Sequence, residues 1–167
     1  MRTTVLALVA AFSLSTALPA LAHDFKVGTL QIEHPWTRAT PPGAKTGAGF
    51  MVITNTGDAP DRLTGGTSPI STKMEVHTMT MDGGVMKMRQ LTDGLEIPAG
   101  ETVALKPGGN HMMFVGLDHA ITEDEKVTAT LDFEKAGKVD VTFAVTPPGA
   151  PGPKNGHGDM KMPKANQ

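Results

Sequence analysis

Two stretches near the end of the chain alternate apolar and polar residues with a period that fits a β-strand. The apolar residues of the first are Val127, Ala129, Leu131 and Phe133, and those of the second are Val139, Val141, Phe143 and Val145. A period of two places such residues on one face of a strand. Because Ala136-Gly137 lies between the two stretches and is typical of a turn, we predict a β-hairpin.

The preceding part of the chain shows the same organisation. Short β-rich runs separated by Gly, Pro, Asn and Asp predict strands at 29–33, 47–54, 62–67, two segments within 76–89, 101–106 and 111–117. We expect His34-Pro35-Trp36 to end the first strand, with Trp36 in the core. Gly65-Gly66 predicts a kink, and 95–100 predicts a turn. Eight or nine short strands without a helix predict an all-β fold, an antiparallel Greek-key β-sandwich.

The two ends of the chain differ from this body. Arg2, a mostly apolar run at 5–18 and Ala20-Leu21-Ala22 are together typical of a secretory signal peptide. We therefore expect cleavage after Ala22, a periplasmic location and no membrane insertion of the processed chain. Residues 147–167 lack apolar periodicity and predict a flexible tail. The predicted domain spans 23–146, and we expect it to be a monomer.

The chain contains no cysteine, which excludes several kinds of site. An exported protein without cysteine has no disulfide framework, thiol nucleophile, thiolate zinc site or blue-copper centre. The formal net charge is −2 with both signs interspersed, so no basic patch indicates nucleic-acid binding. Methionine is abundant instead, and seven of the 11 methionines lie between residues 74 and 113.

Much of this methionine lies in the predicted hairpin within 76–89. If Asp82-Gly83 forms its two-residue loop, His77 faces Met88, whereas a Gly83-Gly84 loop slips the pairing by two. Both alternatives put the same side chains on one face, because the side-chain period is two. That face carries one imidazole and four thioethers, from His77, Met79, Met81, Met86 and Met88.

A second segment, His111-Met112-Met113, follows a turn at 107–110. On a strand, His111 and Met113 point the same way, and Met112 points to the opposite face and the core. The candidate metal ligands are therefore His77, Met88, His111 and Met113, separated by 10, 22 and one residues. The remaining hairpin methionines, Met79, Met81 and Met86, are either a soft exposed surround or auxiliary ligands.

Imidazole and thioether donors together favour Cu(I). Soft thioethers select this ion, whereas zinc and the hard cations require thiolates, carboxylates or several imidazoles. Alternating methionines on an exposed face would otherwise form an apolar patch without a use. The sequence therefore predicts a Cu(I) site with two histidines and two methionines.

The His77 and Met88 pair, the His111-x-Met113 pair and the approach at 106–110 resemble the periplasmic copper chaperones of the PCu(A)C family. The similarity extends to His34-Pro35-Trp36 and to 39–43, although the gap between Met88 and His111 is slightly longer than in the family. The resemblance implies a cupredoxin-like β-sandwich with accessible Cu(I) and no enzymatic activity. It also implies copper delivery to cytochrome c oxidase assembly, with the oxidase copper subunit and Sco-type proteins as partners.

Two further segments could hold a second copper. The tail contains His157, Met160 and Met162, and family members with such tails are thought to use them as a mobile copper site. Cleavage after Ala22 would expose His23, whose amine and imidazole could chelate Cu(II). The alternatives are an inert tail and an ordinary N-terminal histidine.

Other functions fit the sequence less well. Periplasmic copper storage or resistance would use the same ligands. A copper oxygenase with an N-terminal histidine brace at His23 would need a second histidine nearby, and none has an obvious placement. A purely structural sandwich would not explain the methionine excess.

Overall fold

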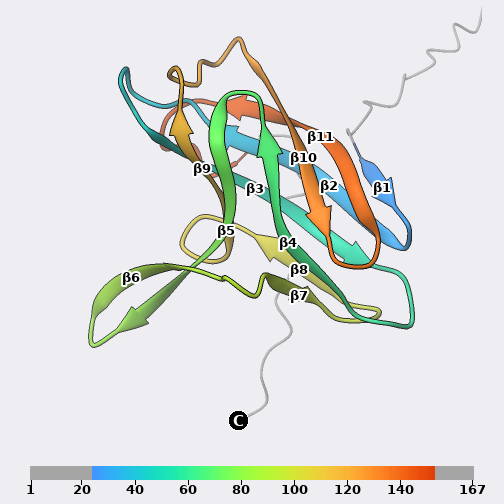
Figure 1. Ribbon diagram of the computed structural model, residues 1–167. Helices are drawn as coiled ribbons and strands as arrows, with labels where there is room; N and C mark the ends of the chain where they lie inside the picture. The colour runs from blue at the N-terminus through green and yellow to red at the C-terminus, as the bar shows by residue number, and fades with distance from the viewer. Residues whose placement is uncertain (1–23, 153–167) are drawn as a thin grey trace, which may run out of the picture.

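The computed structural model describes residues 24–152, and the regular secondary structure in this range consists of β-strands joined by turns and loops (Figure 1). The strands are β1 (Phe25–Val27), β2 (Leu30–Arg38), β3 (Thr46–Asn55), β4 (Asp61–Ser68), β5 (Ser71–Asp82), β6 (Val85–Gln90), β7 (Leu95–Ile97), β8 (Thr102–Leu105), β9 (His111–Leu117), β10 (Lys126–Phe133) and β11 (Gly137–Thr146). Within this range, no helix is long and apolar enough to cross a membrane. The prediction of an all-β chain is confirmed.

Seven of the strands close into a ring. Their order is β2-β11-β10-β4-β5-β9-β3, and β3 pairs back to β2. The short strands β1, β6, β7 and β8 pair with β2, β5, β4 and β3 outside this ring. All pairings are antiparallel except that of β2 with β11, where Trp36 pairs with Ala144. The predicted turn at 95–100 is wrong in its first half, because 95–97 form strand β7 along β4.

The interior is filled by the alternating side chains of the barrel strands. The predicted apolar face of β10, from Val127 to Phe133, is buried, and Phe143 on β11 packs edge-on against Phe114 with ring centroids 5.5 Å apart. Gly49 on β3 lies directly over this pair, since a Cβ at that position would lie 2.8 Å from Cε1 of Phe143. The backbone of β3 therefore approaches the aromatic core closely.

Strand β2 contains one extra residue, which corrects two predictions. Glu33 pairs with Val52 and Trp36 pairs with Phe50, so three steps on β2 match two on β3. His34 lies in this irregularity with a φ of 49°. Such a bulge reverses the faces of all later residues. His34-Pro35-Trp36 therefore does not end the strand, and Trp36 is buried on the outer face instead of in the main core.

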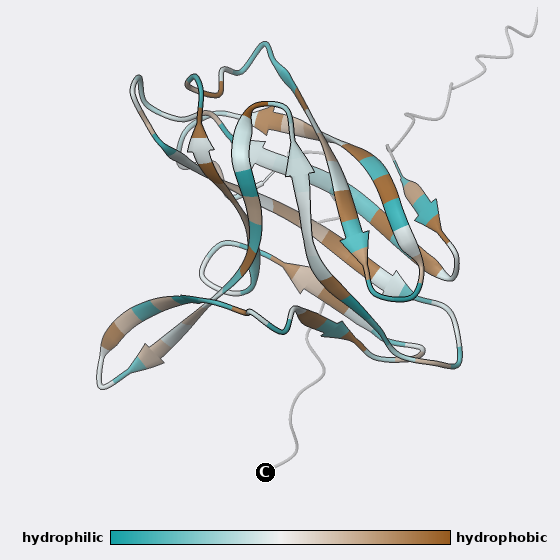
Figure 2. Cartoon of the chain, in the orientation of Figure 1, coloured by the Kyte–Doolittle hydropathy of each residue, from teal (hydrophilic) through white to brown (hydrophobic). Residues whose placement is uncertain are grey.

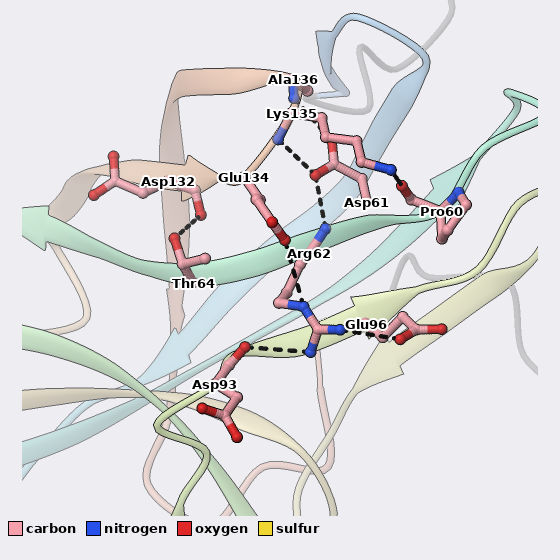
Figure 3. A network of polar contacts seen from close by, with 10 residues as sticks. All are labelled: Pro60, Asp61, Arg62, Thr64, Asp93, Glu96, Asp132, Glu134, Lys135 and Ala136. Carbon is pink, nitrogen blue, oxygen red and sulfur yellow. Dashed lines mark hydrogen bonds and ion pairs between the residues drawn. The ribbon is translucent and has the colours of Figure 1, made fainter.

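A polar network joins the start of β4 to β7 and to the turn between β10 and β11 (Figure 3). The carboxylate of Asp61 accepts backbone N–H bonds from Arg62, Lys135 and Ala136 at 2.7, 2.9 and 2.8 Å. Burial alone would raise the pKa of Asp61, but these three donors outweigh it and hold the pKa below its ordinary value of 3.8. The guanidinium of Arg62 also pairs with Glu96 at 3.1 Å.

Candidate metal centre

Strands β5 and β9 bring the two predicted histidines together. His77 and His111 are direct cross-strand partners, and their ring centroids lie 6.0 Å apart. Zinc binds an imidazole nitrogen at about 2 Å. With metal–nitrogen bonds of that length, rings at this separation could share one ion. Met113 pairs with Glu75 two residues along the strands and so shares the face of the histidines, whereas Met112 is fully buried on the core face, as predicted.

The hairpin of β5 and β6 carries the candidate ligand Met88, and its register differs from the first of the two predicted alternatives. Its loop is Gly83-Gly84, with φ angles of 58° and 82°, as a two-residue turn with positive φ at both positions requires. His77 therefore faces Gln90, not Met88, and Met88 faces Met79. The second alternative is confirmed, and the predicted donors still share one face.

The ring of His77 is held by a carboxylate. Its Nε2 lies 3.0 Å from Oε2 of Glu75, and both side chains are largely buried. A carboxylate only accepts hydrogen bonds, so Nε2 carries the proton and Nδ1 of the neutral ring keeps a free lone pair. That Nδ1 atom is buried and has no hydrogen-bond partner within residues 24–152. A buried lone pair without a partner suits a metal ligand.

His111 has the complementary arrangement. Its Nδ1 lies 3.0 Å from the carbonyl oxygen of Gly109, which can only accept, so Nε2 keeps the lone pair. The same carbonyl accepts the backbone N–H of Met79 at 3.3 Å. The turn before β9 thereby fixes the imidazole of His111 and connects it to the hairpin.

Aromatic side chains on the outer face support the site from one side. Phe50 lies 6.4 Å from the ring of His111 and 4.5 Å from that of Trp36, centroid to centroid. The guanidinium of Arg38 lies 5.6 Å from the centroid of Trp36, and its Nε donates a 2.8 Å hydrogen bond to the carbonyl of Ala150. The sequence interpretation missed Glu75 and Phe50 as neighbours of the site. Period two was the available signal for Glu75, since it precedes His77 by two residues on the same strand.

The proposed donors differ in how far they reach into solvent. His111 is 5% exposed and Met113 is half-buried, whereas Met88 is 50% exposed. No cluster of three or more His, Cys, Asp or Glu side chains within the described range could hold a metal. The candidate set therefore combines imidazoles with thioethers, and Met88 is its most exposed member.

The remaining histidines of the described range are not part of this cluster. His119, which was not a predicted ligand, is exposed, and hydrogen bonds to Glu125 and Asp118 raise its pKa. His23 and the tail set of His157, Met160 and Met162 fall outside the described residues, as does the predicted signal peptide.

Comparison with known proteins places the chain in a family. The family described as "Putative lipoprotein LpqE-like" matches residues 30–145, more than half of the chain and nearly the whole barrel. The chain belongs to this LpqE-like family. A relative from Leifsonia xyli subsp. xyli, described as "Putative lipoprotein Lxx21020", is 30% identical over 116 residues, which are 70% of this chain and 69% of that protein.

Two solved structures share the LpqE-like chain's fold. The copper-bound PCuAC domain from PmoF2 is 32% identical with a TM-score of 0.64, over 75% of this chain and 99% of that domain. The solution structure of CuI-DR1885 from Deinococcus radiodurans is 30% identical with a TM-score of 0.57, over 79% of this chain and 81% of that chain. The predicted resemblance to the PCu(A)C family and the predicted cupredoxin-like fold class are confirmed.

Proposed function

We propose that this protein is a Cu(I)-binding metallochaperone and that His77, His111, Met113 and Met88 hold its cargo. The observation that carries the proposal is the pair of opposed imidazoles, each with one nitrogen occupied by a fixed acceptor and the other left with a lone pair. Thioethers on the same face make the set soft, which favours Cu(I) over zinc or harder ions. The copper-bound PCuAC domain from PmoF2 and CuI-DR1885, which share this fold, support the same cargo.

The gradient of exposure suggests how copper would leave. His111 is buried, Met113 is half-buried and Met88 is open to solvent. A partner's donor can therefore displace the thioether of Met88 first, while the imidazoles still hold the ion. Copper would then pass by stepwise ligand exchange without being released, and no enzymatic step is needed.

The family resemblance is the basis for the proposed recipient. We propose delivery to cytochrome c oxidase assembly, with the oxidase copper subunit and Sco-type proteins as partners, in the periplasm after export. The N-terminal signal pattern and the lipoprotein description of the matched family support export. Deleting the gene should lower oxidase activity when copper is scarce. Copper sensitivity with normal oxidase activity would instead favour storage or resistance.

A titration of Cu(I) against a competing chelator tests the site. We expect His77→Ala, His111→Ala and Met113→Leu each to weaken Cu(I) binding. Each loss should exceed the ~10–100-fold that removal of a hydrogen-bond partner of a metal ligand typically costs. His119→Ala and Met51→Leu are the matched controls, because they change an exposed histidine and a core methionine away from the site. Unchanged Cu(I) affinity in the His77 and His111 variants would refute the assignment.

A further inference from the structure

The tip of the β5–β6 hairpin exposes a group of apolar side chains. Over the described part of the chain, the large hydrophobic residues that are exposed are Met81, Val85, Met86 and Met88, at 66, 60, 48 and 50%. All four lie on this hairpin, which projects from the barrel and carries apolar segments out to its end (Figure 2). Three of the four are methionine, so the group has a specific chemistry as well as low polarity.

The register arranges the methionines as two stacked pairs. Met81 faces Met86 near the tip. Met79 faces Met88 two residues closer to the barrel, on the same face of the hairpin. Directly opposed Cβ atoms lie about 4.5–5.5 Å apart and diagonal ones about 7–8 Å, within reach of long side chains. Since Met88 is assigned to the first site, the thioethers of Met79, Met81 and Met86 remain as a compact triangle on the same face.

The backbone of Met79 connects this triangle to the first site. Met79 is half-buried, and its N–H donates to the Gly109 carbonyl that also holds the His111 ring. The charged residues of the tip alternate to the opposite face, where Lys87 pairs with Asp82 at 2.6 Å. The methionine face therefore offers only neutral, soft donors, and it runs from solvent to the proposed imidazole pair.

We propose that Met79, Met81 and Met86 form a second, weaker Cu(I) site, a station through which copper passes between the solvent-exposed tip and the first site. This inference rests on the proposed function. Three thioethers without an imidazole or a thiolate suit Cu(I) and bind it less tightly than a set with two imidazoles, as a transient station requires. The transfer is ligand exchange without change of oxidation state.

Methyl NMR of the full-length protein tests this site directly. Methionine methyl groups are labelled with ¹³C and assigned by single Met→Leu variants, and up to three equivalents of Cu(I) are added under anaerobic, reducing conditions. The first equivalent should shift the signals of Met88 and Met113, and a later one those of Met79, Met81 and Met86. The double variant Met81→Leu with Met86→Leu should lose one Cu(I) equivalent and keep the first at unchanged affinity.

The leucine variant separates metal binding from protein docking, because leucine keeps the apolar volume and removes the sulfur. Val85→Leu is the matched control on the opposite face of the tip and should keep every copper equivalent. The inference is overturned if Met88 and Met113 shift while Met81 and Met86 stay unchanged up to three equivalents. If Met88 and Met113 themselves do not respond, the proposed first site fails instead.

Discussion

Removing the carboxylate of Glu75 tests how the first site is organised. Its Oε2 lies 3.0 Å from Nε2 of His77, and the two side chains are 21% and 12% exposed, so solvent competes little for this hydrogen bond. In Glu75→Ala, the proton of His77 is free to move to Nδ1 and block the lone pair that we assign to copper. Loss of such a partner typically lowers metal affinity by about 10–100-fold, or roughly 1.4–2.7 kcal/mol.

The assay is the Cu(I) competition titration, run beside urea unfolding of the copper-free protein. Glu75→Gln should fall between wild type and Glu75→Ala, because its amide oxygen can still accept the same proton but carries no charge. Glu101→Ala, an exposed carboxylate outside the site, should match wild type. If Glu75→Ala binds Cu(I) as tightly as wild type while His77→Ala does not, the hydrogen bond does not orient the ring and the reasoning is refuted.

Two further predictions concern the barrel itself. Gly49→Ala should destabilise the copper-free protein by about 1–3 kcal/mol in urea unfolding, because its Cβ would lie 2.8 Å from Phe143; a change near zero would show that the ring moves aside freely. Asp61→Asn should cost about 1.5–3 kcal/mol at pH 7 through its weaker backbone hydrogen bonds. Since the folded pKa of Asp61 is depressed, its contribution is present above the unfolded pKa and lost as pH falls through the folded one. The difference from wild type should therefore shrink in unfolding at pH 3, and an equal difference at both pH values would exclude the charge as its cause.

Local patterns sufficed to predict the strands that hold the site. Strand β9 runs from His111 to Leu117 as expected, because a Gly-rich turn precedes it and the polar segment 118–125 follows it. The faces of the hairpin were also predictable, because both two-residue loops preserve them. Which residues pair across the hairpin was not predictable, because Asp-Gly and Gly-Gly both favour a two-residue turn. In the structure, glycine occupies both loop positions with positive φ.

The support around the site depends on tertiary structure that the sequence pattern does not reveal. Period two puts Trp36 on the same face as Leu30 and Ile32, and only the extra residue in β2 reverses it. The placement of Phe50 beside His111 then follows from pairing of β2, β3 and β9, segments that are far apart in the chain. Such long-range register depends on how the whole barrel closes, which alternation within one strand does not encode.

The parallel pairing of β2 with β11 has a consequence for the timing of folding. It joins residues 36–38 to residues 144–146, so the ring closes only after nearly the whole chain is available. Contacts between such distant segments make folding slow, in the range of about milliseconds to seconds for β-barrels of high contact order. A chain that crosses a membrane in extended form would thus keep this barrel open until β11 has emerged, and the closed barrel would form only in the compartment that the chain enters.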